Sequence, residues 1–169
     1  PPAACPCKKR SRQHKSARRA CLLSRQRGAW TSLPCYGATT MRSAYRIVSD
    51  HYAASSRGNL AGMLADMDER TEWTEMAGFP LAGTYVGAAA IGAGVFQALQ
   101  RDWEGFRVEI ERLIDGGDSV VAVGRYAATH RRSGKSFKAR VAHVWTVEDG
   151  RIRRFEQFCD TLLVDRATR

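Results

Sequence analysis

Four strand-length segments separated by three turn sequences constrain the fold of this chain more than any other feature. The segments cover residues 103–114, 119–129, 136–147 and 151–159. The links are rich in glycine and polar residues: Gly116-Gly117-Asp118, residues 131–135, and Glu148-Asp149-Gly150. Because such short links join neighbouring strands, each successive pair should be antiparallel. The second half of the chain is therefore predicted to form an antiparallel meander.

Helical patterns precede the meander. Residues 43–56 carry apolar side chains at helical spacing, and Asn59 can cap a short second helix. A third helix is predicted over residues 87–99. Helices followed by antiparallel strands indicate an α+β fold, in which a curved sheet wraps around the helices.

The segment between the second and third helices holds a short predicted strand and a loop. Residues 71–76 suit a strand, and Gly78-Phe79-Pro80 ends it. Gly83 and Gly87 are then expected to frame a turn.

Positive charge is concentrated at the start of the chain. The whole sequence has 27 Lys and Arg against 17 Asp and Glu, a net charge of +10. Residues 1–40 hold nine of the basic residues, no acidic residue and four of the five cysteines, which leaves 18 basic and 17 acidic residues over 41–169. We therefore predict one nearly neutral domain over 41–169, with no nucleic-acid partner.

Residues 1–40 are predicted to be a disordered basic extension, because they show no apolar periodicity. Three interpretations stay open: an over-extended reading frame upstream of Met41 that is not part of the native protein, an organelle transit peptide, and a nucleic-acid-binding arm. The spacing of Cys5, Cys7, Cys21 and Cys35 fits no common zinc site. No apolar run is long enough for a membrane span, and none within residues 1–40 is long enough for a secretory signal. We therefore expect a cytoplasmic protein with no membrane partner.

Sequence motifs for cofactors and metals are not found. The glycines between Gly83 and Gly94 lack the Lys-Ser/Thr of a phosphate loop and the spacing of a dinucleotide fingerprint. The histidines show no metal-ligand spacing, and no G-x-S-x-G elbow is present. Neither a cofactor nor a metal is therefore expected.

A histidine shares one face of a predicted strand with two apolar residues. Strand alternation places Val141, His143 and Trp145 on the same side. The following strand ends in the segment Phe155-Glu156-Gln157-Phe158-Cys159-Asp160-Thr161, which places a carboxylate on the neighbouring strand. This carboxylate could reach the His143 side and form an acid/base pair with it. The alternatives are that Asp160 caps a final turn beginning at Thr161, and that His143 is a satisfied sheet histidine.

Three sequence blocks carry a resemblance to a known family: TEWTEMAGFPLAGTYVGAAAIGAGVF, GGDSVVAVGRY and AHVWTVEDGRIRRFEQFCDT. In their order and spacing, residues 43–166 resemble the SnoaL-like, ketosteroid isomerase-related branch of the nuclear transport factor 2-like superfamily. The resemblance implies a cone-shaped α+β fold, with three N-terminal helices packed on a strongly curved, mainly antiparallel sheet. It also implies an apolar pocket and a homodimer.

The same resemblance implies a cofactor-independent isomerase, cyclase or dehydratase acting on a small apolar metabolite. Asp160 would be the acid/base group and His143 its partner.

The expected substrate-binding residues are aromatic: Trp73, Tyr52, Trp145 and Phe158, with the Tyr52 phenol offered to a substrate oxygen. In the alternative interpretation, Trp73 and Trp145 are plain core and the domain is a non-catalytic ligand-binding or dimerisation module.

Overall fold

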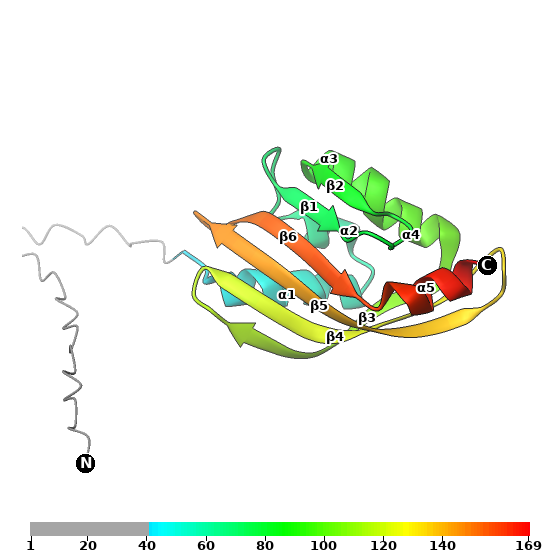
Figure 1. Cartoon of the computed structure of the whole chain (residues 1–169). Helices are drawn as coiled ribbons and strands as arrows, with labels where there is room; N and C mark the ends of the chain where they lie inside the picture. Colours follow the sequence, from blue (N-terminus) through cyan, green and yellow to red (C-terminus); the bar gives the residue numbers. More distant parts are fainter. Residues whose placement is uncertain (1–40) are drawn as a thin grey trace, which may run out of the picture. The chain divides into compact units, whose positions relative to one another are not determined.

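The structure is a computed structural model and describes residues 41–169. The basic extension predicted over residues 1–40 lies outside the described residues. Within 41–169, helices come first and a six-stranded sheet follows, so the α+β class is confirmed. Figure 1 shows the elements in chain order.

Two helices open the domain, as predicted. Helix α1 (Ala44–Ser56) begins after Ser43, whose hydroxyl accepts the Arg46 N–H and so satisfies one free backbone donor of the first turn. Helix α2 (Leu60–Leu64) begins after Asn59, whose side chain accepts the Gly62 N–H.

The third predicted helix is confirmed and runs three residues further. It consists of α3 (Ala88–Ile91), a π-helical turn η1 (Gly92–Phe96) and α4 (Gln97–Asp102). A π turn widens the helix locally and changes the direction of the side chains that follow. Gly94 allows this turn to pack closely, because a Cβ there would lie 2.5 Å from the Tyr85 ring.

The sheet has the strand order β2-β1-β6-β5-β4-β3. Its strands are β1 (Glu72–Glu75), β2 (Gly83–Val86), β3 (Trp103–Asp115), β4 (Ser119–His130), β5 (Ser136–Glu148) and β6 (Arg151–Cys159). The predicted antiparallel meander β3 to β6 is confirmed. Strands β1 and β6 pair in parallel, so the sheet is mixed and is not closed into a barrel.

The turn expected between Gly83 and Gly87 is wrong, since Gly83–Val86 forms β2 against β1. This edge strand is short and mostly exposed, so it has no buried alternating face that the sequence could reveal. The chain ends in α5 (Thr161–Thr168), which contacts β5.

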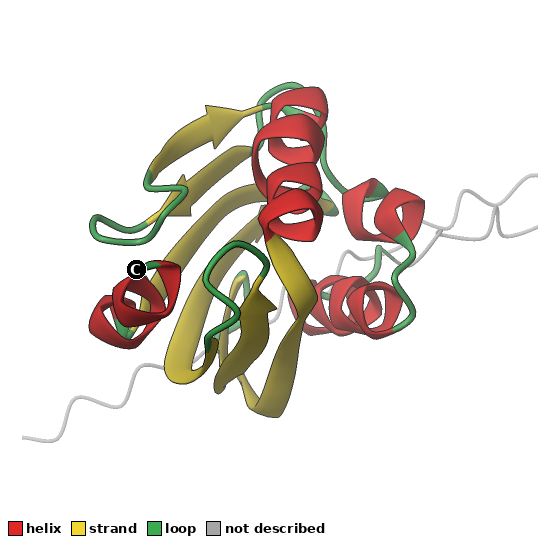
Figure 2. Ribbon diagram, turned by 90° about the vertical axis from the view of Figure 1, so that its right-hand side faces the viewer, coloured by secondary structure: helices red, strands yellow, loops and turns green. Residues whose placement is uncertain are grey.

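The sheet bends strongly because the pairing of β3 with β4 is interrupted twice. The register shifts between Glu104 and Arg107 and again between Ile110 and Arg112. Gly124 pairs with Ile110 beside the second shift, and a Cβ there would lie 2.2 Å from the Glu109 carbonyl oxygen. Figure 2 shows the bend, with α5 near the C-terminal label at one side of the sheet.

Two apolar clusters fill the space between the sheet and the helices. The first is formed by side chains of α1, η1 and the sheet, among them Ile47, Trp73 and Phe155. The second lies against α5 and includes Phe79 and Tyr126. None of the described helices is long and apolar enough to cross a membrane.

Candidate active site

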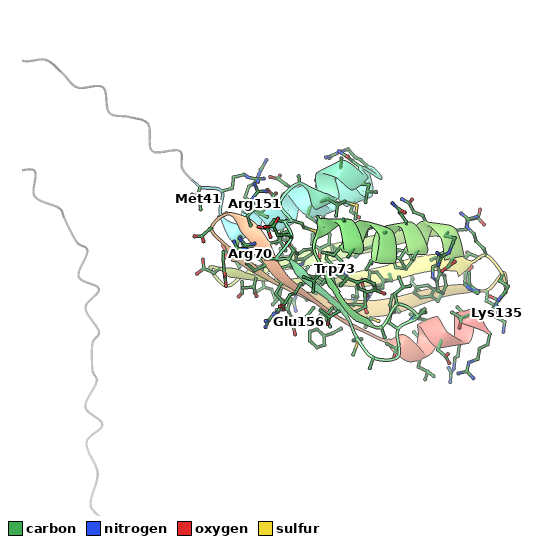
Figure 3. The ribbon with its side chains drawn as sticks, turned by 90° about the horizontal axis from the view of Figure 1, so that it is seen from above. Met41, Arg70, Trp73, Lys135, Arg151 and Glu156 are labelled. Carbon is green, nitrogen blue, oxygen red and sulfur yellow. The ribbon has the colours of Figure 1, made fainter. Side chains whose placement is uncertain are left out.

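A cavity of about 150 Å³ lies within the domain. Its lining comes from α1, the third helix and the inner face of the sheet, and includes His51, Tyr52, Trp73, Glu75, Phe96, Phe106, Tyr126, His143, Trp145 and Phe155. Figure 3 shows Trp73 in the middle of the domain, between Met41 at one end and Lys135 at the other. The lining of the cavity is therefore rich in aromatic side chains, with a few polar groups among them.

A chain of hydrogen bonds connects two tyrosines through His143. The Tyr52 hydroxyl lies 2.7 Å from His143 Nδ1, and the Tyr126 hydroxyl lies 2.7 Å from His143 Nε2. Trp145 Nε1–H donates to the Tyr52 oxygen at 2.9 Å, and the Gln157 amide donates to the Tyr126 oxygen at 3.1 Å. The side chains of this hydrogen-bond network thus come from three strands and one helix: β4, β5, β6 and α1.

His143 is neutral in this setting. Burial, with a smaller contribution from the nearby His51, lowers its pKa to about 3. A neutral imidazole carries one N–H and one lone pair, so it donates to one tyrosine and accepts from the other.

One tyrosine hydroxyl hydrogen in this hydrogen-bond network therefore has no acceptor within it. If Tyr52 donates to Nδ1, then His143 Nε2–H donates to Tyr126, whose own hydrogen is unused; in the other tautomer Tyr52 has the unused hydrogen. In both cases a tyrosine that lines the cavity keeps an O–H to give to a ligand. Burial raises the pKa of both tyrosines, which keeps them protonated donors.

Glu75 is the buried carboxyl group of the site. It comes from β1, is 3% exposed and accepts a hydrogen bond from Trp73 Nε1–H at 2.7 Å. Its Oε2 is buried and has no hydrogen-bond partner among the described residues. Burial raises the pKa of Glu75 to about 7, against smaller opposing effects of Trp73 and Gln157.

A second histidine, His51, borders the cavity from α1. It is 5% exposed, and its Nδ1 lies 3.0 Å from the Met63 carbonyl oxygen. Burial lowers its pKa to about 4, although the bond to Met63 opposes this effect.

Four of the six residues predicted from the sequence line the cavity: Tyr52, Trp73, His143 and Trp145. The face predicted for His143 is also confirmed, since Val141, His143 and Trp145 are all buried on β5.

Asp160 and Phe158 lie elsewhere. Asp160 is exposed and caps α5, with its carboxylate accepting the Leu163 N–H at 3.4 Å, so the expected contact with His143 does not form. Phe158 is 47% exposed on the other face of β6, because strand alternation points it away from Gln157. The capping alternative for Asp160 is confirmed.

Three polar residues of the site, Glu75, Tyr126 and Gln157, were not predicted from the sequence. The sequence does contain an indication for Glu75, because strand alternation puts it on the same face as Trp73 two residues earlier. Its position beside Gln157 depends on the parallel pairing of β1 with β6, which joins residues far apart in the sequence.

The described residues contain no cluster of three or more His, Cys, Asp or Glu side chains that could hold a metal ion.

Comparison with solved structures shows the same architecture in other proteins. A nuclear transport factor 2-like protein of Burkholderia thailandensis E264 is 55% identical, with 76% of this chain and 99% of that one covered at a TM-score of 0.75. A nuclear transport factor 2-like protein of unknown function from Burkholderia pseudomallei K96243 is 28% identical. The match covers 73% of this chain and 95% of that one, at a TM-score of 0.68. TerC, crystallised with polyporic acid, is 27% identical. The match covers 73% of this chain and 96% of TerC, at a TM-score of 0.66.

A comparison with curated proteins finds no significant match. The SnoaL-like domain, by contrast, matches residues 48–155, which run from α1 into β6. This range includes all the residues named above as lining the cavity. With the helices, the bent sheet and the cavity described above, this match confirms the expected resemblance: the chain belongs to the SnoaL-like family and has the nuclear transport factor 2-like fold.

Proposed function

We propose that the cavity binds a small apolar metabolite and that Glu75 moves a proton on it. The observation that carries this proposal is a buried carboxyl group with a free oxygen, placed in the same cavity as a tyrosine hydroxyl that has a hydrogen to donate. Such a pair can remove a proton from carbon and stabilise the oxygen anion that forms.

The proposed reaction is isomerisation of an unsaturated ketone. Ionised Glu75 takes a proton from the carbon next to the carbonyl group, while a tyrosine O–H donates to the carbonyl oxygen as it gains charge. Glu75 then returns the proton to a different carbon, and the double bond moves into conjugation. A pKa of about 7 suits both steps, because it makes the carboxylate a stronger base than an exposed one and still lets it ionise near neutral pH.

Glu75 replaces Asp160 as the acid/base group, and His143 becomes a positioning residue. With a pKa of about 3, His143 does not gain a proton near neutral pH. Its two hydrogen bonds instead hold both tyrosine hydroxyls in place. The Tyr52 role expected from the sequence is retained, shared with Tyr126.

The comparisons support a small-molecule ligand. TerC, at 27% identity, was crystallised with polyporic acid, a small organic compound. Two Shewanella proteins of the same fold carry the name 'putative SnoaL-like polyketide cyclase'; at 13% identity they indicate the fold alone.

The test is turnover of cyclohex-3-en-1-one to cyclohex-2-en-1-one, followed by the ultraviolet absorbance of the conjugated product. We expect Glu75→Gln to abolish turnover, and Asp160→Asn, outside the cavity, to leave it unchanged. Activity of the wild type should rise with pH around a midpoint of about 7, as Glu75 ionises. A wild type with no turnover, or a Glu75→Gln variant with full turnover, would contradict the proposal.

A non-catalytic ligand-binding module is the second candidate. It is favoured by the mutual pairing of Tyr52, His143 and Tyr126, which also serves to hold the core together. In that case cyclohex-2-en-1-one would bind with similar affinity to the wild type and to Glu75→Gln, and neither would turn over the isomer.

We also propose a homodimer formed through the outer face of the sheet. On this face Ala142 lies between Val123 and Phe158 in register, and Phe158 and Ile114 are about half exposed. An exposed apolar surface of this kind is typical of protein interfaces. Light scattering after gel filtration should give a dimer mass for the wild type and a monomer mass for Phe158→Glu; a monomeric wild type would contradict the proposal.

A further inference from the structure

The reaction proposed above makes no use of His51, although His51 is a buried titratable side chain bordering the cavity. A carbonyl oxygen can only accept a hydrogen bond, so the contact with Met63 requires that Nδ1 carries the hydrogen. Because the imidazole is neutral, Nε2 then has a lone pair.

This lone pair is available to a ligand. Nε2 has no hydrogen-bond partner among the described residues, whereas Nδ1 of the same ring is fully used by Met63. A hydroxyl or N–H group of a bound molecule would supply a partner for Nε2.

The walls around His51 favour a flat ring. The His51 ring centre lies 4.8 Å from that of Trp145 and 5.5 Å from that of Tyr52, with Trp73 and Phe96 slightly further away. A flat ligand ring in the cavity would face the same aromatic side chains, and offset or edge-on contacts between aromatic rings are favourable. A cavity of about 150 Å³ has room for one six-membered ring with small substituents.

The charges around the cavity favour an uncharged ligand. Among the described lining residues the one Lys or Arg is Arg107, which is exposed and donates to Glu109. An anionic ligand would therefore meet Glu75 without a buried cation to balance it. A cationic ligand would lose its hydration while Glu75 is only partly ionised at neutral pH.

We propose that the ligand is an uncharged single-ring compound carrying a hydroxyl group, and that His51 Nε2 accepts the hydrogen bond from that hydroxyl. This inference rests on the proposed function, since it assigns the second polar anchor of the same cavity. The carbonyl group lies at the tyrosine and Glu75 end, and the hydroxyl group lies at the His51 end.

The test compares acetophenone with 3-hydroxy- and 4-hydroxyacetophenone, which differ from it by the hydroxyl group alone. At pH 7 we expect at least one hydroxy isomer to bind the wild type about 10-fold more tightly than acetophenone does, by titration calorimetry. The ¹⁵N resonance of His51 Nε2 should move upfield with that isomer and stay in place with acetophenone.

Two substitutions at His51 distinguish the hydrogen-bonding roles of its two ring nitrogens. In His51→Asn the shorter amide can still donate to the Met63 carbonyl but offers nothing at the Nε2 position, so the hydroxyl preference should be lost. In His51→Gln the longer amide places an oxygen near the Nε2 position, so part of the preference should return. His130→Asn changes a buried histidine that does not line the cavity and should leave binding unchanged.

The outcomes distinguish this inference from the proposed function. Binding of all three ketones with equal affinity, or a hydroxyl preference that survives in His51→Asn with an unmoved Nε2 resonance, would overturn the role of His51 and leave the Glu75 reaction standing. Failure of all three ketones to bind would overturn the hydroxyl anchor at His51, while cyclohexenone turnover still decides the reaction. A preference that persists in Glu75→Gln would support His51 as the acceptor.

Discussion

The strongest quantitative prediction concerns the pH dependence of stability at Glu75. Its pKa is about 7 in the folded protein and 4.5 in the unfolded chain. The raised folded value means that the folded state binds the proton more tightly. The contribution to stability is therefore fully present below pH 4.5 and is lost as the pH rises through about 7.

The magnitude follows from the two pKa values. Between pH 5 and pH 8 the wild type should lose about 2.5 kcal/mol of unfolding free energy through this group. Glu75→Gln has nearly the same shape and does not titrate, so it loses nothing over this range. The variant should therefore gain about 2.5 kcal/mol relative to the wild type between pH 5 and pH 8.

Urea unfolding at constant ionic strength, repeated at several pH values, measures this difference. His51 and His143 have lowered pKa values, so their contribution is lost as the pH falls through about 4 and about 3. Both histidines are present in both proteins and cancel in the comparison. Glu72→Gln, an exposed change on the same strand, controls for the altered net charge. A wild-type minus Glu75→Gln difference that does not vary with pH would refute the argument from burial.

Three further predictions concern other positions. Tyr126→Phe should lower kcat for cyclohexenone isomerisation about 100-fold with little change in KM, because it removes a donor to the developing oxygen anion. Asp160→Ala should cost about 1 kcal/mol in urea unfolding, as loss of a helix cap does, and leave kcat unchanged. Gly124→Ala should cost at least about 2 kcal/mol, because the new Cβ would meet the Glu109 carbonyl oxygen; thermal unfolding at pH 7 checks it.

Local patterns along the chain predict most of the secondary structure and the orientation of β5. Turn residues mark the ends of the meander strands, and alternation along β5 places His143 inside with Trp145. These are local properties, because each depends on residues a few positions apart. The edge strand β2 lacked such a pattern and was missed.

Tertiary structure alone decided which groups meet in the cavity. Asp160 follows Cys159 directly, yet the chain leaves the sheet there to begin α5, so its carboxylate caps a helix instead of reaching His143. Glu75 reaches the site because β1 pairs in parallel with β6, and Tyr126 because β4 pairs with β5. Register between distant strands depends on packing across the whole sheet, whereas strand and helix ends depend on local residues. For this reason Glu75, the proposed acid/base group, could be identified only from the folded structure.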